Sequence, residues 1–438
     1  MSIFKACDIR GVYPDELNEE HAFALGRALG TELAGGVCVL GGDLRCSTPA
    51  LKGAVRDGLL RSGADVIDLG VVPTPVAYWA RRSMSAHGVA VVTASHNPPR
   101  YNGMKFMVGD RPPMPEDVAR LAQRVQAGDF AGGSGQASER NVKRQYLDWL
   151  RSRFGRAPEG LRVLVDAGNG CASEWAPTAL REAGCHVEEL FCEPDGTFPN
   201  RSPNPSSSEA LVEASRQVRE RGVDLAVAFD GDADRAVFLD EAGTFVDGDK
   251  AIIIFARDVL ARERDAAVVY DLKCTRRVPE QVTLAGGRAL PERSGYAFIK
   301  SRLLNDGAAF AGEASGHFFF RELGGDDGIY AALRMAQIVK AGGRPFSELL
   351  ASIPPYFITP DIRIPRRSGD GHRTVEHLKK AFDDYPQDYT DGVRIEFGNG
   401  WALCRVSVTE PVITLRFEGD TPEALEEIRS RVLAEIPD

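Results

Sequence analysis

One pattern occurs three times in this chain: a short apolar run that ends in a polar loop. The runs are Val89–Val92, Asp224–Phe229 and Ala308–Ala311, and segments with apolar residues at helical spacing lie between them. Strands that alternate with helices in this way predict parallel sheets joined by βαβ crossovers. Ligands bind beyond the carboxyl ends of the strands in such sheets. The three polar loops are therefore the candidate positions of a site.

The length of the chain and its change of pattern predict four domains. A chain of 438 residues is too long for one hydrophobic core. After three α/β units, strand patterns at Val393–Phe397, Trp401–Val408 and Val412–Phe417 precede a final helix. The predicted fold class is α/β: three successive α/β domains with mostly parallel sheets, then a smaller C-terminal α+β domain. The expected boundaries are 1–140, 141–243, 244–355 and 356–438.

Composition excludes several classes of function. The net charge is −10, and a general nucleic-acid binder needs a basic face. No apolar run approaches the ~20 residues of a membrane span, and the start lacks the apolar core of a signal peptide. The eight cysteines include no C-x-x-C pair, so they form neither a disulfide framework nor a zinc site. We expect a cytoplasmic protein with reduced thiols and no nucleic-acid or membrane partner.

The first polar loop places a hydroxyl directly after a strand. Ser95 follows the run Val89–Val92 and stands beside His96 and Asn97. A hydroxyl at this position can act as a nucleophile or carry a phosphoryl group. The same Ser, Asn and Pro composition is also typical of a turn without chemistry, so this loop alone leaves both interpretations open.

The second loop carries three carboxylates at alternate positions, Asp230, Asp232 and Asp234. Such carboxylates can converge on one hard cation, and Mg²⁺ prefers oxygen ligands. An EF-hand loop would need Gly at its sixth position and a helix before it, but Arg235 stands there and a strand precedes it. A purely structural cluster is disfavoured because the carboxylates repel one another at short range.

A different enzyme class also matches this second loop. An apolar strand followed by Asp-x-Asp resembles the aspartyl-phosphate phosphatases, in which the first Asp is the nucleophile. Asp230 would then be the nucleophile, and Asp326 and Asp327 would be the later acidic pair. That signature normally opens its domain, and this alternative leaves the Ser95 loop unexplained.

The third loop and two later stretches supply groups suited to sugars and phosphates. Glu313 and Ser315 suit hydrogen bonds to sugar hydroxyls, and His317 is a possible proton carrier. Arg405, Ser407 and Thr409 alternate, so on a strand they point one way and can bind a phosphate. A polar turn and an exposed strand face are the alternatives for these two stretches. The basic stretch Asp271–Arg277 follows another strand end.

Together these residues resemble the α-D-phosphohexomutase superfamily, and most closely its bacterial phosphomannomutase/phosphoglucomutase branch. The resemblance runs nearly from end to end, and the phosphoserine and magnesium loops in this order are specific to it. The matching stretches are Phe4–Gly11, Thr93–Pro98, Glu193–Asn200, Asp230–Arg235, Asp271–Arg277 and Gly312–His317.

The resemblance implies four domains around one cleft and a phosphoryl-transfer reaction. Phosphorylated Ser95, with Mg²⁺ on Ser95 and the three aspartates, would donate its group to a hexose monophosphate of mannose or glucose. The hexose 1,6-bisphosphate so formed would reorient and return its other phosphate to Ser95, which is a transfer that depends on positioning and charge neutralisation. The implied partners are hexose phosphates, and we expect a monomer or a weak homodimer.

The resemblance also implies roles for individual residues. Lys105 and His317 are expected as proton or charge partners, Arg10 as a stabiliser of charge, and His96 and Asn97 as supports of the loop. Glu313 and Ser315 would hold O3 and O4 of the sugar. The residues expected to bind the substrate are Arg235, Lys273, Arg276, Arg293, Glu313, Ser315, Arg405, Ser407 and Thr409.

Some positions depart from the branch and leave the substrate open. Cys7 stands where Tyr is usual, Ala314 replaces Met, and Val408 replaces Asn. Arg293 and Tyr296 lie where Lys and His are usual, and Arg and Lys are not equivalent phosphate ligands. Glucosamine phosphate is therefore an alternative substrate, and a sugar-phosphate-binding protein with weak catalysis is an alternative function.

Overall fold

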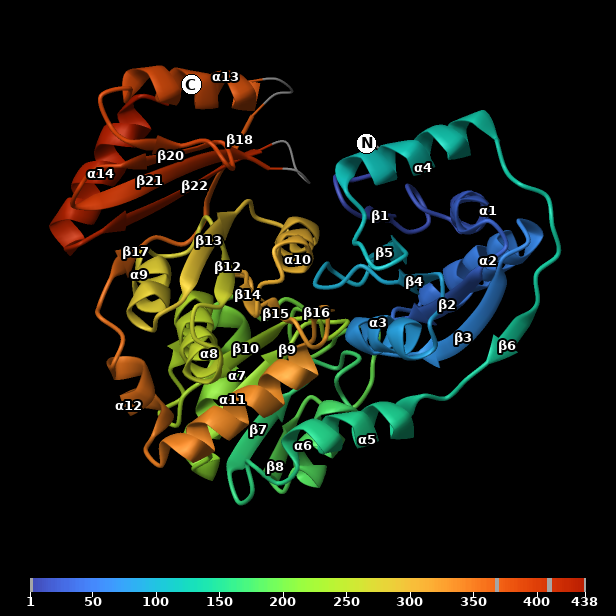
Figure 1. Ribbon diagram of the computed structural model, residues 1–438, viewed down its shortest axis with the longest axis horizontal. Coiled ribbons are helices and arrows are strands. Elements are labelled where there is room, and N and C mark those ends of the chain that lie inside the picture. The colour runs from blue at the N-terminus through green and yellow to red at the C-terminus, as the bar shows by residue number, and fades with distance from the viewer. Residues whose placement is uncertain (1–2, 367–369, 408–411, 437–438) are drawn as a thin grey trace.

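The structure is a computed structural model that describes residues 3–366, 370–407 and 412–436. Four sheets follow one another along the chain, and Figure 1 shows them in colours from blue to red. Each of the first three sheets has a parallel core with antiparallel strands at one side. The fourth sheet is antiparallel. The predicted fold class is confirmed.

The first sheet has the strand order β1-β5-β4-β2-β3-β6. Its strands are β1 Ile9–Val12, β2 Val37–Gly42, β3 Asp65–Val71, β4 Gly88–Val92, β5 Tyr101–Val108 and β6 Ala137–Glu139. Its helices are α1 Glu19–Leu33, α2 Thr48–Arg61, α3 Thr74–Ser83 and α4 Pro115–Ala127. The sequence analysis did not predict β5 or α3, and both contribute residues to the site.

The second sheet has the order β11-β10-β9-β7-β8. Its strands are β7 Arg162–Asp166, β8 His186–Leu190, β9 Leu225–Phe229, β10 Ala236–Leu239 and β11 Phe245–Val246. The helices are α5 Lys143–Phe154, α6 Ala176–Glu182, and α7 Val212–Arg221, which a 3-10 turn, Ser208–Leu211, precedes. Strand β11 pairs with β10 although it lies just past the predicted boundary at residue 243.

The third sheet repeats the arrangement with the order β13-β12-β14-β15-β16. Its strands are β12 Ala267–Asp271, β13 Arg288–Glu292, β14 Phe310–Gly312, β15 Phe318–Phe320 and β16 Gly325–Asp326. Its helices are α8 Gly248–Arg262, α9 Arg277–Leu284, α10 Tyr296–Asn305, α11 Gly328–Gly342 and α12 Phe346–Ala351. Strands β4, β9 and β14 each deliver one of the three polar loops.

The fourth sheet has the order β17-β22-β21-β20-β19, and β18 also pairs with β22. Its strands are β17 Phe357–Ile358, β18 Ile362–Pro365, β19 Gln387–Asp388, β20 Val393–Glu396, β21 Gly400–Val406 and β22 Val412–Gly419. Helices α13 Asp370–Ala381 and α14 Pro422–Ala434 cover it. None of the helices in the described part of the chain is both long and apolar enough to cross a lipid bilayer.

The hydrophobic core joins the first three units and leaves the fourth with a core of its own. One cluster contains Ala77 from α3, Tyr146 from α5 and Phe255 from α8. The fourth unit packs around residues such as Leu378 and Phe417. Its contacts with the third unit include hydrogen bonds from Arg394 to the Leu272 carbonyl, 2.8 Å, and from Thr275 to Glu418, 3.0 Å.

Candidate active site

Ser95 lies directly against the loop of aspartates. It follows β4, is 1% exposed, and its Oγ donates a hydrogen bond to Asp230 Oδ2 at 2.8 Å. Its φ of +49° lies in the left-handed region, which non-glycine residues seldom adopt and which recurs at functional sites. Two loops about 135 residues apart in sequence therefore meet at one hydroxyl and one carboxylate.

Gly231 makes this close approach possible. A Cβ at Gly231 would lie 2.6 Å from the carbonyl oxygen of Ser95, a distance that real Cβ atoms do not show. Glycine without a Cβ is the residue that permits two backbones to approach in this way. The Asp-Gly-Asp sequence therefore supplies both the carboxylates and the space for the Ser95 loop.

Arg45 fixes the other side of the Ser95 loop. Its guanidinium is fully buried and donates to the carbonyl oxygens of Ser95 and Asn97 at 2.7 Å each, and to Pro98 at 2.6 Å. Its Nε donates to Asp43 at 2.9 Å, which supplies the counter-charge. The guanidinium of an arginine has five N–H donors in a fixed planar fork, whereas an ammonium group has only three donors and no fixed fork.

The three aspartates form a buried cluster that fits a divalent cation. One carboxylate oxygen from each of Asp230, Asp232 and Asp234 lies within 4.8 Å of the others. The Oδ1 atoms of Asp232 and Asp234 are buried without a hydrogen-bond partner. Burial and the carboxylates of Asp234 and Asp232 raise the pKa of Asp230 to about 8. Unpartnered, mutually repelling oxygens are the donors that Mg²⁺ prefers.

Lys105 balances part of this charge. It lies on β5, where it pairs with Val91 of β4, and its Nζ donates to Asp232 Oδ2 at 2.8 Å and to Asp234 Oδ2. Burial disfavours its charged form, but the carboxylates of Asp232 and Asp234 outweigh this and raise the pKa of Lys105. Lys105 is therefore a fixed positive charge beside the cluster.

His317 is held between an arginine and an acid. Arg235 Nε donates to His317 Nε2 at 3.0 Å, so Nε2 carries a lone pair. The proton then resides on Nδ1, which lies 3.0 Å from Asp326 Oδ2 and donates to it. Asp326 is 3% exposed and is the last residue of β16, so the third sheet positions both the histidine and its partner.

Arg10, Asn97 and His96 surround the Ser95 hydroxyl. Arg10 Nη1 donates to Asn97 Oδ1 at 2.8 Å and its Nη2 pairs with Asp8 at 2.5 Å. His96 Nδ1 lies 3.3 Å from Ser95 Oγ. Burial and the charges of Arg235 and Arg10 hold the pKa of His96 well below its usual value, so its imidazole is neutral.

A cleft of about 690 Å³ opens beside these groups and is lined by all four units. Seven of the predicted site residues contribute to its lining, and they are His96, Arg235, Lys273, Glu313, Ser315, Arg405 and Ser407. Glu313 accepts a hydrogen bond from Ser315 at 2.7 Å through Oε1, while its Oε2 is buried without a partner. The free oxygen is suited to bind a hydroxyl group of a ligand.

Known proteins match this arrangement along the whole chain. Profiles of the phosphoglucomutase/phosphomannomutase family match in four consecutive parts: alpha/beta/alpha domain I at residues 1–132, domain II at 144–243, domain III at 247–357 and the C-terminal domain at 362–435. The chain belongs to this family. The resemblance predicted from the motifs is confirmed, and the family is one of phosphomannomutase and phosphoglucomutase enzymes.

Named relatives of this phosphoglucomutase/phosphomannomutase family member match it over nearly the whole chain. The phosphomannomutase/phosphoglucomutase of Pseudomonas aeruginosa is 38% identical over 436 residues, which are 98% of this chain and 94% of the relative. The phosphoglucomutase of Neisseria gonorrhoeae is 38% identical over 445 residues, or 99% and 96%. The crystal structure of a family protein from Burkholderia thailandensis has a TM-score of 0.92 and 36% identity, and covers 98% of this chain and 96% of its own.

In this family member, some predicted substrate ligands have protein partners. Arg405 Nε pairs with Asp391 at 2.6 Å, and Asp391 also accepts from the Ser294 backbone at 3.1 Å. Arg276 pairs with Asp420, and its Nε lies 3.8 Å from Glu418, at the contact of the third and fourth units. Their roles toward a substrate stay predictions.

Arg293 and Thr409 were also predicted to bind the substrate. The Arg293 guanidinium lies over the Phe298 ring at 4.2 Å, and Arg293 is not among the described residues that form the wall. Thr409, like Val408, lies outside the described residues.

Sequence reasoning missed Thr74, and it named Asp326 only as an acid of the phosphatase alternative and Tyr296 only as a departure from the branch. Thr74 at the start of α3 donates to Asp232 at 2.6 Å, and Asp326 accepts from His317. Tyr296, which stands where the branch usually has His, donates through its hydroxyl to the Cys7 carbonyl at 3.0 Å. The Thr-Pro start of α3 is a helix-start signal that could have located Thr74, whereas the Tyr296 contact joins positions 289 apart.

Proposed function

We propose that this protein interconverts hexose 1-phosphates and hexose 6-phosphates of mannose and glucose through a phosphoserine at Ser95 and a hexose 1,6-bisphosphate intermediate. The observation that carries the proposal is the hydrogen bond of 2.8 Å from Ser95 Oγ to Asp230 within a buried cluster of three carboxylates. A serine that only shaped a turn would have no need of a buried acidic cluster with unpartnered oxygens.

We propose that Asp230, Asp232 and Asp234, with an oxygen of phosphorylated Ser95, hold Mg²⁺. The cation would supply neutralisation of the charge that develops on the transferred phosphoryl group. The protein keeps the three carboxylates in place through Thr74, Lys105 and the backbone amide of Arg235. Preorganised ligands of this kind lower the cost of reaching the transition state.

His317 is the residue best suited to accept the proton of the attacking sugar hydroxyl. Burial lowers its pKa, but the carboxylates of Asp234 and Asp326 raise it above the usual value, so its unprotonated Nε2 is a competent base once Arg235 no longer donates to it. Arg235 covers that atom at 3.0 Å. When Arg235 turns to a substrate phosphate, Nε2 becomes available. Lys105 and Arg10 then act as positive charges and take no part as bases.

The cleft would hold the two ends of the substrate separately. Glu313 would accept hydrogen bonds from the vicinal hydroxyls O3 and O4, and the Ser315 hydroxyl would donate to them. Arg405, Ser407 and Thr409 would bind the phosphate that is not reacting, with help from Lys273, Arg276 and Arg293. The sugar would then lie between one phosphate position at Ser95 and another at Arg405. The bisphosphate could turn end over end between these two positions and return its other phosphate to Ser95.

The proposal of mannose and glucose phosphates as substrates is based on the names of the relatives, which are phosphomannomutase/phosphoglucomutase and phosphoglucomutase. The test is turnover of mannose 1-phosphate, glucose 1-phosphate and glucosamine 1-phosphate after priming with glucose 1,6-bisphosphate. We expect turnover of the first two and a kcat/KM at least tenfold lower for the third. A clear preference for glucosamine 1-phosphate would overturn the assignment of substrate. If the protein bound these sugar phosphates and turned none of them over, the proposal that it is an active mutase would be wrong.

A further inference from the structure

A second cavity, of about 570 Å³, shares no lining residue with the cleft of about 690 Å³ described above, which we call the sugar cleft. Helix α3 of the first unit, α5 of the second, and α10 with the β15–β16 loop of the third form its walls. We call it the basic pocket because five cations line it: Arg81, Arg82, Arg153, Lys300 and Arg321. We propose that the basic pocket binds a phosphate monoester that carries a planar ring.

The positive charge of the basic pocket is only partly balanced. Within the described ranges, neither Arg82 nor Arg153 pairs with a carboxylate, although the chain as a whole has a net charge of −10. Arg82 donates to the backbone carbonyls of Glu322, at 3.2 Å, and Leu323. Cations without counter-charges around a cavity attract an anion from solution.

The carboxylates of the pocket are largely occupied elsewhere. Glu322 accepts from Tyr330 at 2.5 Å and lies 3.5 Å from Arg334. Asp327 accepts from Tyr146 at 2.6 Å and caps the start of α11. Asp110 pairs with Arg81, but its side chain is 82% exposed, so water screens the pair. These three acids therefore do little to neutralise Arg82 and Arg153, and the fourth carboxylate of the pocket, Asp326, lies 3.9 Å from Lys300.

The floor of the basic pocket contains buried polar groups without good partners. Lys300 is 1% exposed, and its Nζ lies 3.9 Å from Asp326, over the Tyr78 ring at 4.2 Å. Its only hydrogen bond among the described residues is to the sulfur of Met107 at 3.6 Å. The Tyr78 hydroxyl is buried without a partner. A buried ammonium and hydroxyl are costly unless a ligand or water satisfies them.

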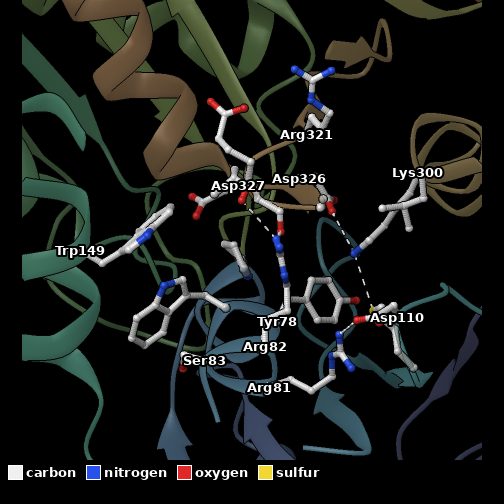
Figure 2. Close-up of a pocket in the computed structure, with 18 of the residues that line it drawn as sticks. Tyr78, Arg81, Arg82, Ser83, Asp110, Trp149, Lys300, Arg321, Asp326 and Asp327 are labelled. Carbon is white, nitrogen blue, oxygen red and sulfur yellow. Dashed lines mark hydrogen bonds and ion pairs between the residues drawn. The ribbon is translucent and has the colours of Figure 1, made fainter. Parts of the chain in front are cut away.

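An aromatic wall faces this polar floor. In Figure 2, Trp149 lies on one side of the pocket and Lys300 on the other, with Arg82 between them. The Arg153 guanidinium lies over the Trp149 ring at 5.7 Å. Trp149 already stacks on Tyr146, with ring centroids 6.0 Å apart, so a planar ring would pack against the Arg153 guanidinium and the rest of Trp149 while a phosphoryl group reaches Arg82 and Lys300. A volume of about 570 Å³ accommodates a ligand of this size.

Asp326 connects the basic pocket to the reaction site. Its Oδ2 accepts from His317, while its Oδ1 has no hydrogen-bond partner and lies 3.9 Å from Lys300. A phosphoryl group that pairs with Lys300 would therefore lie next to the acid that orients His317. The proposal of a ligand here does not depend on which sugar phosphate the cleft accepts.

The test is isothermal titration of the full chain with AMP, adenosine and ribose 5-phosphate, without Mg²⁺. We expect AMP to bind at least tenfold more tightly than the other two, because only AMP has both the ring and the phosphate. Arg153→Ala, a change of an exposed side chain, and Lys300→Met should each weaken AMP binding at least tenfold. Arg405→Ala, which changes the sugar cleft, should leave AMP binding unchanged.

Three results would overturn the proposal. One is no detectable heat with AMP at millimolar concentration. Another is adenosine binding as tightly as AMP, since the basic pocket would then not recognise the phosphate. The third is AMP binding that is lost in Arg405→Ala and kept in Arg153→Ala, which would place AMP in the sugar cleft.

Discussion

Arg45 donates a hydrogen bond of 2.7 Å to the carbonyl oxygen of Ser95, and both residues are buried. The same guanidinium also binds the carbonyls of Asn97, Pro98 and Tyr101. The loop that presents the proposed phosphoserine is therefore held from behind by one arginine. Its left-handed backbone at Ser95 is maintained because these four carbonyls have a common donor.

Arg45→Lys should lower turnover strongly although it keeps the charge. An ammonium group cannot donate to four carbonyls and Asp43 at once, so we expect kcat to fall on the order of a hundredfold from misplacement of Ser95. Arg45→Met should also destabilise the fold by about 3–5 kcal/mol, because Asp43 would be left buried and unpaired. Turnover assays and urea unfolding measure the two effects.

Arg56→Met is the matched control for Arg45. Arg56 lies on α2 and pairs with Asp57 at the surface, where both side chains are more than 40% exposed. This change should alter stability by less than about 0.5 kcal/mol. If Arg45→Lys retained wild-type kcat, the loop would not depend on the arginine fork.

Lys105→Met should tighten Mg²⁺ binding and reduce turnover at the same time. The lysine occupies Oδ2 of both Asp232 and Asp234 and adds a positive charge beside the cluster. Its removal leaves the carboxylates more negative, so Mg²⁺ affinity should rise on the order of tenfold. Isothermal titration with Mg²⁺ measures this, with Lys143→Met at the exposed pair with Glu174 as the control. Weaker Mg²⁺ binding would mean that Lys105 does not oppose the cation.

The stabilisation by Mg²⁺ should increase with pH. Asp230 has its pKa raised to about 8, so the folded, metal-free protein keeps a proton that the unfolded chain loses near its ordinary pKa. Without a cation, the free energy of unfolding therefore falls as the pH rises from the ordinary pKa of an aspartate to the raised pKa of about 8. Mg²⁺ displaces the proton and should bind more tightly at pH 8 than at pH 6. The measurement is the shift in Tm on adding Mg²⁺ at both pH values.

Asp230→Asn provides the control for this pH dependence. The change removes the titrating group, so the shift in Tm with Mg²⁺ should become small and nearly the same at both pH values. A Mg²⁺ effect that is larger at pH 6 than at pH 8 in the unchanged protein would contradict the assignment of Asp230 as the protonated ligand.

Asp232→Asn should abolish Mg²⁺-dependent turnover with little loss of stability. The substitution relieves repulsion within a buried cluster of like charges, and this offsets the loss of the ion pair with Lys105, while the amide oxygen of Asn can still accept from Thr74. Circular dichroism and thermal unfolding should show an intact fold, while the activity assay shows no response to Mg²⁺. Turnover that still responds to Mg²⁺ would exclude Asp232 as a ligand.

The elements that deliver the site were predictable because they rest on local rules. β4, β9 and β14 are apolar runs that end in polar loops, and such runs form buried strands. The carboxyl ends of these strands then fix where the loops project. Ser95 and Asp230 could be placed in this way without knowledge of the contacts between domains.

The residues that complete the site depend on contacts distant in sequence. Thr74 and Asp232 are 158 positions apart, and Lys105 and Asp234 are 129 apart. The periodicity of a local stretch of sequence cannot predict such a pair, because the two residues meet only when whole domains pack together. Lys105 was identified from the motif alone, since its strand β5 was not predicted.

The central claim is that Ser95 carries the phosphoryl group. The direct measurement is mass spectrometry of the intact protein and its peptides after incubation with glucose 1,6-bisphosphate. We expect one phosphoryl group, stable in acid, that maps to Ser95, is absent from Ser95→Ala and disappears when excess glucose 1-phosphate is added. An acid-labile acyl phosphate on Asp230 that persists in Ser95→Ala would contradict it.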